Sequence, residues 1–546
     1  MTVAQAIGEA LAELGVRHVF GLVGSGNFAI TNALVGAGAT FIPSRHEGGA
    51  ITMADAYARV SGRLGVCSVH QGPGLTNTMT GLTEASKSRT PVLVLAADTA
   101  AAAIHSNFRI DQDRVVASVG AVPERIRSRS TAVADAVRAA RRAQTERRPV
   151  VLSMPLDIQA AEAPEDFHLP AAPVLRPARP AEAAVKELAR ELARAKRPLI
   201  LAGRGAVLSD ARGPLEQLGE AVGALLATSA VANGLFSSSP WSLGISGGFA
   251  TPLAAELIAQ SDLVLAFGAS LNMWTTRQGR LVGPEAVVVQ VDHEAEAIGA
   301  QHRVDVGVLG DVAEAARALL GELGGQSAKG WRTSALAERI RTHRWRDEPF
   351  ADGGDARHID PRTLSIAVDE ILPAGRAVAV DSGHFMGYPA MYLRVDSPDA
   401  FVFTQAYMSI GLGLASAVGA AVARPDRLTV AAVGDGGALM ALPELETASR
   451  LGLDLLVLIY NDAAYGAEVH HFAHTGQSLE IVRFPDTDFA AVGRALGLEG
   501  VTVRSKTDLE AVRAWVDAGR RTGLVVDAKV APGVSAEWLE EAFRGH

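Results

Sequence analysis

Two aspartates in the last third of the chain have a spacing that suits a metal ion holding a diphosphate. Asp435 lies in Val433-Gly434-Asp435-Gly436-Gly437, and Tyr460-Asn461-Asp462 begins 25 residues after it. Carboxylate oxygens are hard ligands for Mg²⁺, and glycines let backbone amides approach a diphosphate closely. A Gly-Asp turn after a buried strand would explain the first segment alone. The second aspartate at this spacing favours the metal site.

A second group of reactive side chains lies near the start of the chain. It comprises Ser44-Arg45-His46-Glu47-Gly48-Gly49-Ala50 and Val69-His70-Gln71-Gly72-Pro73-Gly74-Leu75-Thr76-Asn77. Glu47 has two interpretations: an acid in an apolar surround that holds a proton, or a first-turn acid favoured by the helix dipole. His70 is a catalyst or a satisfied buried histidine. Cys67, in an apolar run, is interpreted as a buried strand residue rather than a nucleophile.

The elements around the aspartates predict how they are positioned. Apolar runs at 428–433 and 455–460 flank an amphipathic helix at 441–451. This is a strand–helix–strand unit of the length that a parallel crossover needs. It places both aspartates beyond the carboxyl ends of neighbouring strands, where ligands of open α/β sheets bind.

The same alternation runs through the whole chain and predicts an α/β protein with three doubly wound parallel-sheet domains. With 546 residues, the chain is too long to fold around a single hydrophobic core. Proline-rich and alanine-rich sequence at 158–184 and polar sequence at 324–360 are interpreted as linkers. We therefore expect domains at 1–160, 185–323 and 361–546.

Composition excludes several classes of protein. The net charge of -9 and the absence of a basic stripe argue against nucleic acid as a partner. A single cysteine excludes an intramolecular disulfide framework and a cysteine metal cluster. No uncharged apolar run reaches membrane-spanning length, and residues 1–15 lack the pattern of a signal peptide. The expectation is a cytoplasmic protein without a membrane partner.

Taken together, these segments resemble a known family. The Arg45-His46-Glu47 turn, the Gly72-Pro73-Gly74 turn, the Gly434-Asp435-Gly436 motif and the domain order look like those of thiamine-diphosphate-dependent enzymes of the pyruvate decarboxylase, acetolactate synthase and benzoylformate decarboxylase superfamily. The resemblance covers essentially the whole length. It implies a pyrimidine-binding domain, a middle domain and a diphosphate-binding domain.

The resemblance also implies where thiamine diphosphate and Mg²⁺ bind. Glu47 would hydrogen-bond the aminopyrimidine and promote loss of the thiazolium proton. The metal would lie on Asp435, Asp462 and the backbone oxygen of Ala464, although most relatives have asparagine at position 462. The other expected cofactor contacts are Ser382, Gly383, His384, Phe385, Met408, Ile410, Gly434, Gly436, Gly437, Ala438 and Tyr465. Among them, Ile410 would wedge between the two rings.

For the reaction, the resemblance implies decarboxylation of a 2-oxo acid, followed by protonation to an aldehyde or by carboligation to a second carbonyl. His70 and Glu468 would relay protons, with Ser25 as a further catalytic residue. Ser25, His70, Gln112 and His471 would line the substrate.

Two alternatives remain open. One is a flavin-containing acetolactate synthase proper, and the other is a non-catalytic cofactor-binding relative. Departures from the synthase pattern, such as Ser270-Leu271-Asn272-Met273-Trp274 where that enzyme has its flavin-contacting stretch, argue against FAD.

Because family sites form between one chain's first domain and its neighbour's third, we expect at least a homodimer and more specifically a homotetramer.

Overall fold

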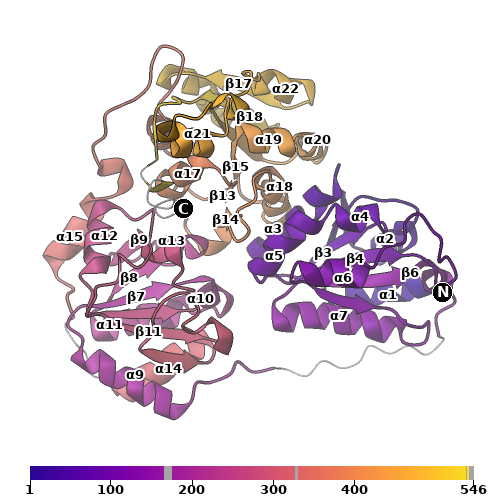
Figure 1. Cartoon of the computed structure of the whole chain (residues 1–546), viewed down its shortest axis with the longest axis horizontal. Helices are drawn as coiled ribbons and strands as arrows, with labels where there is room; N and C mark the ends of the chain where they lie inside the picture. Colours follow the sequence, from indigo (N-terminus) through magenta and orange to yellow (C-terminus); the bar gives the residue numbers. More distant parts are fainter. Residues whose placement is uncertain (165–174, 326–329, 537, 540–546) are drawn as a thin grey trace.

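Three parallel sheets of six strands each organise the chain in a computed structural model (Figure 1). The structure describes residues 1–164, 175–325, 330–536 and 538–539. The expected α/β fold class is confirmed. Parts of both predicted linkers and the last residues of the third predicted domain lie outside the described residues, so the domain boundaries stay predictions. No helix in the described part of the chain has the length and apolar character that a membrane crossing requires.

The first sheet has the order β2-β1-β3-β4-β6-β5. Its middle strands are buried on both faces, as in β4, where all seven residues of VLVLAAD are buried, so helices must cover both sides. The strands are β1 (His18–Gly21), β2 (Thr40–Pro43), β3 (Gly65–Val69), β4 (Val92–Asp98), β5 (Val122–Arg125) and β6 (Val150–Pro155). The helices are α1 (Val3–Glu13), α2 (Phe28–Gly36), α3 (Glu47–Ser61), α4 (Pro73–Thr76), α5 (Met79–Lys87), α6 (Gln112–Ser118), α7 (Ala132–Glu146) and α8 (Leu156–Ala160).

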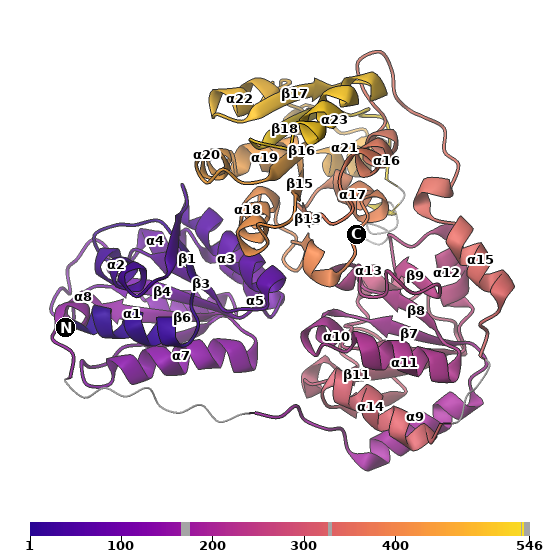
Figure 2. The same ribbon diagram turned by 180° about the vertical axis from the view of Figure 1, so that it is seen from behind.

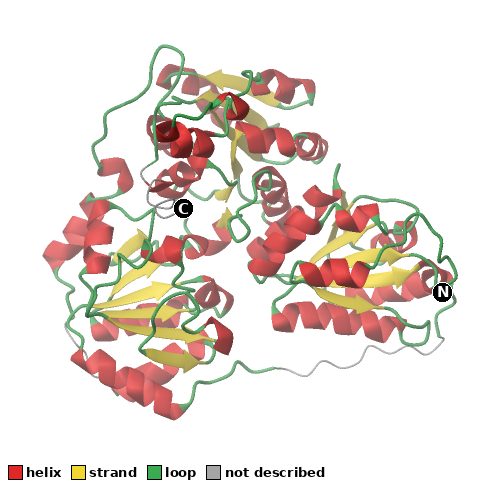
Figure 3. Cartoon of the chain, in the orientation of Figure 1, coloured by secondary structure: helices red, strands yellow, loops and turns green. Residues whose placement is uncertain are grey.

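The second sheet has the order β12-β11-β10-β7-β8-β9 and again lies between helices (Figure 3). Its strands are β7 (Pro198–Ala202), β8 (Leu225–Thr228), β9 (Ser242–Ile245), β10 (Leu263–Phe267), β11 (Val287–Asp292) and β12 (Val306–Leu309). Its helices are α9 (Glu182–Arg194), α10 (Arg204–Leu208), α11 (Arg212–Val222), α12 (Pro252–Ala259), α13 (Met273–Thr276) and α14 (Val312–Leu323).

The third sheet has the order β14-β13-β15-β16-β18-β17. Its strands are β13 (Ala377–Val380), β14 (Phe401–Phe403), β15 (Thr429–Gly434), β16 (Leu455–Asn461), β17 (Glu499–Val503) and β18 (Leu524–Lys529). Its helices are α16 (Pro361–Ile371), α17 (Gly387–Tyr392), α18 (Gly413–Ala423), α19 (Asp435–Met440), α20 (Pro443–Arg450), α21 (Gly466–Phe472), α22 (Phe489–Ala495) and α23 (Glu510–Asp517).

The first and third sheets share one hydrophobic core through helices α3 and α18, which lie side by side in both views (Figures 1 and 2). The sequence of α18, GLASAVGAAVA, consists mostly of small residues, and nine of its eleven are buried. At the crossing, a Cβ on Gly419 would overlap the backbone of Met53 in α3. Small side chains therefore allow the two helices to pack closely.

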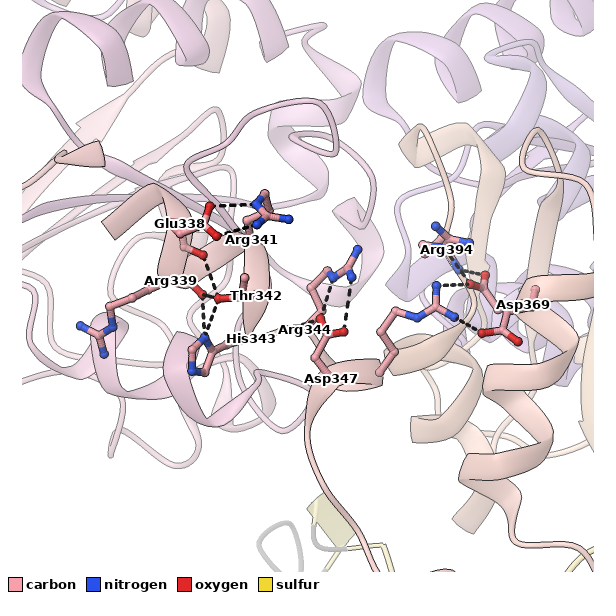
Figure 4. A network of polar contacts seen from close by, with 11 residues as sticks. Glu338, Arg339, Arg341, Thr342, His343, Arg344, Asp347, Asp369 and Arg394 are labelled. Atoms are coloured by element: carbon pink, nitrogen blue, oxygen red, sulfur yellow. Dashed lines mark hydrogen bonds and ion pairs between the residues drawn. The ribbon is translucent and has the colours of Figure 1, made fainter. Parts of the chain in front are cut away.

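A charged helix, α15 (Ser334–Thr342), and the turn after it connect the second sheet to the third. Arg344 donates from Nε to Asp347 at 2.8 Å, and Arg394 donates from Nε to buried Asp369 of α16 at 2.7 Å (Figure 4). In the same turn as Arg344, the indole of Trp345 donates to the Phe249 carbonyl of the second domain at 2.7 Å. Arg346 of this turn donates to Glu370 of α16 at 2.9 Å. The turn after the predicted linker helix is thus held against both neighbouring parts of the chain.

Candidate functional site

Asp435 and Asp462 lie together at the carboxyl ends of adjacent strands. Strands β15 and β16 pair in register up to Gly434 and Tyr460. Asp435 is the first residue of α19, and Asp462 directly follows β16. The sequence predicted this juxtaposition, and it follows from the parallel crossover.

The two carboxyl groups interact in a buried environment. Burial raises the pKa of Asp435 to about 6. Burial, followed by the nearby charge of Asp435, raises the pKa of Asp462 to about 7. The charge of Lys529 lowers the pKa of Asp435 but does not offset burial. Two adjacent buried acids cannot both ionise cheaply, and a divalent cation between them would favour the ionised form of both. Among the described residues no group of three or more His, Cys, Asp or Glu side chains is placed to hold a metal. A cation here would therefore need backbone or ligand oxygens besides the two carboxylates.

A cavity of about 470 Å³ opens beside this pair. The predicted cofactor residues Ser382, Gly383, His384, Phe385, Met408, Ile410, Gly434, Gly436, Gly437 and Tyr465 line it, as do the predicted metal residues Asp435, Asp462 and Ala464. Ala438 is buried in α19 and is not among the lining residues. The structure thus brings nearly all of the predicted third-domain set to one cavity.

The glycines of this cavity allow close approach of backbone to side chains. A Cβ on Gly436 would lie 2.7 Å from the Tyr465 ring, and one on Gly437 would overlap Oδ2 of Asp381. Both positions therefore exclude larger residues. The Gly-Asp-Gly-Gly sequence therefore lets this turn pack closely against Tyr465 and Asp381 beside the cavity.

Asp381 organises the segment that carries Met408 and Ile410. Its carboxylate is fully buried and accepts hydrogen bonds from the N–H groups of Gly411 at 3.0 Å and Leu412 at 3.1 Å. Burial raises the pKa of Asp381 to about 6. Met408 has a φ of 59°, and its carbonyl accepts a hydrogen bond from the Ser382 hydroxyl at 3.4 Å. The segment is held with Met408 in a left-handed backbone conformation that residues other than glycine rarely adopt.

Glu47 is buried at the first position of α3. His46 caps this helix by accepting the N–H of Gly48 at 3.0 Å. Asn77 donates from Nδ2 to Glu47 Oε2 at 3.0 Å. The Cβ of a larger residue at Gly74 would lie 3.5 Å from Glu47 Oε1. The two glycine-bearing turns of the first domain therefore meet at this carboxylate.

His70 and Ser25 form a second polar pair in the first domain. The Nδ1 of His70 lies 2.8 Å from the Gln71 carbonyl, and its Nε2 lies 3.4 Å from the Ser25 hydroxyl. Because a carbonyl only accepts, Nδ1 carries the proton and Nε2 is left to accept from Ser25. The ring also contacts Phe108 edge-on, at 4.8 Å between centroids.

The two halves of the predicted site lie apart within this chain. Among the described residues that line the cavity, none precedes Trp274, so Glu47, Ser25 and His70 are absent from it. Gln112 is also distant and buried: its amide donates to the Ala97 carbonyl and Ser153, and its oxygen accepts the N–H of Gly72. The role of Gln112 as a substrate residue stays a prediction.

Helix α21 carries the remaining predicted residues. Glu468 lines the cavity, whereas His471, three positions on, does not and contacts Phe472 instead. His470 stacks on His384 at 4.2 Å between centroids. Burial and His470 lower the pKa of His384 to about 3, and its Nε2 accepts the N–H of Ala536 at 3.1 Å.

Several site residues lie outside the set predicted from sequence. Trp274 of the second domain, Trp538 near the C-terminus and Met440 of α19 also line the cavity. Asn77 belongs to a turn that the sequence singled out, but its contact with Glu47 depends on folding. Trp274 belongs to the 270–274 stretch that was compared with a flavin-contacting segment, whereas no sequence pattern singled out Trp538 or Met440.

Comparisons with known proteins give matches along most of the chain. Residues 1–117, 185–319 and 381–526 match families described as the thiamine pyrophosphate enzyme N-terminal TPP binding domain, central domain and C-terminal TPP binding domain. A protein of Pseudomonas aeruginosa named "Probable 2-ketoarginine decarboxylase" is 32% identical over 95% of this chain and 92% of its own length. A sulfoacetaldehyde acetyltransferase of Alcaligenes xylosoxydans xylosoxydans is 28% identical over 96% and 92%, respectively. An acetolactate synthase large subunit of Parasynechococcus marenigrum is 30% identical over 92% and 83%.

Proposed function

Because this chain belongs to the thiamine pyrophosphate enzyme family, we propose that it is a Mg²⁺-dependent enzyme that decarboxylates a 2-oxo acid, with release of an aldehyde or carboligation to a second carbonyl. The observation that carries this proposal is the pair Asp435 and Asp462 beside a glycine-lined cavity. The relatives named above include a decarboxylase, an acetyltransferase and a synthase, so their names do not point to one substrate. The cofactor comes from the family match.

The residues around the cavity fit the cofactor and its metal. Mg²⁺ would bind the two aspartates and the carbonyl of Ala464, with diphosphate oxygens completing its shell. Backbone amides from Gly436 and Gly437 at the start of α19, and from 382–385, would bind the diphosphate, where glycine leaves the amides accessible. Ile410 would support the bend between the two rings.

When bound, thiamine diphosphate supplies a nucleophilic carbon and a positively charged electron sink for the electrons released as CO₂ leaves. The chain's own groups would then move protons. Glu47 would hold a proton opposite the aminopyrimidine, in a buried position already fixed by Asn77. His70, with Nε2 as acceptor, and Glu468 would relay protons to and from the substrate, while Ser25 and His471 would line it.

Assembly completes this proposal. Glu47 and the cavity lie apart in one chain, so a second copy would bring its Glu47 to this chain's cavity. Large apolar side chains are exposed on both halves: Val23, Phe28, Ile104, Phe108 and Ile110 in the first domain, and Tyr407, Met408, Leu439, Met440 and Phe472 in the third. Such surfaces are typical of subunit interfaces. We propose a homodimer at minimum and a homotetramer as the complete assembly.

The activity is tested with purified protein, thiamine diphosphate and Mg²⁺ on a broad panel of 2-oxo acids, by following CO₂ release and aldehyde or carboligation products. The proposal predicts turnover of at least one acid and its strong loss in Glu47→Gln. No CO₂ release and no carboligation across the panel would refute it. Exchange of the cofactor's C2 proton for deuterium distinguishes a missing substrate from a non-catalytic relative, and a yellow protein would favour the flavin-containing alternative.

A further inference from the structure

Two buried glutamates cross the interface between the first and third domains in opposite directions. Glu444 of α20 is 2% exposed and accepts the backbone N–H groups of Arg45 at 3.2 Å and His46 at 3.1 Å. Its other oxygen accepts the hydroxyl of Thr447 at 2.7 Å. The hydrogen-bond partners of this carboxylate are therefore the turn that leads into Glu47 and its own helix.

Glu84 of α5 makes the mirror arrangement. It is 1% exposed, and its two oxygens accept the backbone N–H groups of Ala406 at 3.3 Å and Tyr407 at 2.7 Å. It also pairs with Arg59 of α3 at 3.0 Å. Arg59 in turn donates to the carbonyl of Phe403 at 3.2 Å. The contacts therefore hold both the start and the end of the segment 403–407, which leads from β14 to Met408.

Each carboxylate binds the two peptides just before a residue of the proposed cofactor site. Arg45 and His46 precede Glu47, and Ala406 and Tyr407 precede Met408, whose φ is 59°. A carboxylate that accepts successive N–H groups fixes the orientation of both peptide planes through charge-assisted hydrogen bonds. The direction in which the next residue leaves the turn is then set by the other domain.

The local sequence accommodates this contact at Glu47. A Cβ on Gly49 would overlap the Oε1 atom of Glu444. Glycine at this position of α3 therefore lets the Glu444 carboxylate reach the turn. Two positions along α20 from Glu444, Glu446 instead pairs with the Arg45 guanidinium at 2.6 Å in an exposed location. This neighbour touches the same residue without touching its peptide N–H.

We propose that Glu444 and Glu84 are reciprocal positioning residues: each domain uses one buried glutamate to orient the segment with which the other domain contacts the cofactor. This inference rests on the proposed function in one respect, namely that Glu47 and Met408 contact thiamine diphosphate. The hydrogen bonds themselves do not depend on that function.

The first test measures amide hydrogen exchange of the cofactor-free protein by mass spectrometry. Glu444→Gln leaves one oxygen acceptor and should speed exchange in peptides covering 44–48, with 404–408 unchanged. Glu84→Gln should do the reverse. Glu446→Gln, the matched control, should change neither. Unchanged exchange in both variants, or equal acceleration of both segments in each, would overturn the proposal.

The second test separates positioning from simple stabilisation of the interface. Glu444→Gln should slow C2 deuterium exchange of bound thiamine diphosphate on the order of tenfold or more, since small misplacements of an acid–base group are costly. In a Glu47→Gln background, the same substitution should add no further loss, because its effect passes through Glu47. Losses that multiply in the double variant would overturn the role of Glu444.

For Glu84, the matching readout is cofactor affinity. Glu84→Gln should weaken the affinity for thiamine diphosphate, measured by quenching of tryptophan fluorescence, and Glu446→Gln should not. Equal affinities for the two variants would overturn the role of Glu84. If the wild type itself shows no C2 exchange, the proposed function fails, while the hydrogen-exchange result still decides whether the two carboxylates orient the turns.

Discussion

At the scale of single residues, the site combines acids that burial drives toward the neutral form. Asp435 and Asp462 share one side of the cavity, and both have raised pKa values for this reason. Asparagine at 462, the usual residue of the resembling family, would avoid part of this repulsion. With aspartate at 462, a bound cation would have to offset two carboxylate charges rather than one.

This difference predicts unequal effects of substitution at the two positions. Asp435→Ala removes a proposed metal ligand and should weaken Mg²⁺-supported binding of thiamine diphosphate by about tenfold or more. Asp462→Asn keeps an oxygen ligand and removes one negative charge facing the diphosphate, so affinity should stay equal or increase. Titration followed by tryptophan fluorescence measures both. A loss in Asp462→Asn as large as that in Asp435→Ala would contradict this assignment.

Asp381 predicts a pH dependence of stability. Its pKa in the folded protein is about 6, against 3.8 in the unfolded chain, because of burial. Because folding raises this pKa, the protonated Asp381 side chain contributes about 3 kcal/mol to the free energy of unfolding. The contribution is fully present below pH 3.8 and is lost as the pH rises through 6. Relative to Asp381→Asn, the cofactor-free wild type should therefore lose thermal stability between pH 4 and pH 7.

The measurement is the melting temperature of both proteins across this range. Other titrating groups are common to the two and cancel in the difference. Melting curves that shift in parallel with pH would show that the buried carboxyl does not titrate there.

At the scale of elements, strand ends and helix starts position the site. Each of Glu47 and Asp435 is the first residue of a helix that follows a parallel strand, α3 after β2 and α19 after β15. The carboxyl edge of a parallel sheet gathers such positions because every strand there ends on the same side. Helices α3 and α18 then join the two sheets that carry them.

The close crossing of α3 and α18 predicts a sharp response to one methyl group. Gly419→Ala would place its Cβ into the backbone of Met53, and overpacking of this kind typically destabilises a protein by about 1–3 kcal/mol. Gly321→Ala in α14 is the matched control, because a Cβ there meets nothing within 4 Å. It should be neutral or stabilising, by up to about 1 kcal/mol of helix propensity. Chemical or thermal unfolding compares the two, and equal effects would contradict the packing argument.

At the scale of the whole molecule, the separation of Glu47 from the cavity is the main finding. One chain carries the proposed diphosphate-binding residues at the cavity and the proposed pyrimidine-binding residues around Glu47, but no described first-domain residue lines the cavity. The proposed site would then require two copies, as closed symmetric dimers provide. The exposed apolar side chains on both halves are consistent with such contacts.

Shared sites predict that two inactive variants restore each other. Glu47→Gln and Asp435→Ala should each have little activity alone. The two variants are co-expressed, or mixed while unfolded and then refolded together. With random pairing, half of the dimers are mixed and each mixed dimer has one site with both residues intact, so activity should return to about a quarter of wild type. C2 deuterium exchange or CO₂ release measures it. Activity no higher than that of the separate variants would indicate sites formed within one chain.

Much of the fold followed from local sequence alone. Apolar runs bounded by glycine turns predicted the strands, and their alternation with amphipathic helices predicted parallel sheets, because both patterns repeat within a few residues. The positions of Asp435 and Asp462 at strand ends were predictable for the same reason. Connection length alone did not make the two strands neighbours, because a connection of similar length joins β2 to β3 across β1. The positions of the domain boundaries stay predictions.

Only the tertiary structure decided how these parts meet. The contact between Arg45 and Glu444 joins residues 399 positions apart, and no local pattern encodes such a pairing. Trp274 and Trp538 reach the cavity from outside the sheet that builds it, and Glu47 remains outside that cavity altogether. Sequence periodicity determines which face of each element is buried. The docking of whole domains, which depends on the shape of the packed surfaces, determines which buried groups become neighbours.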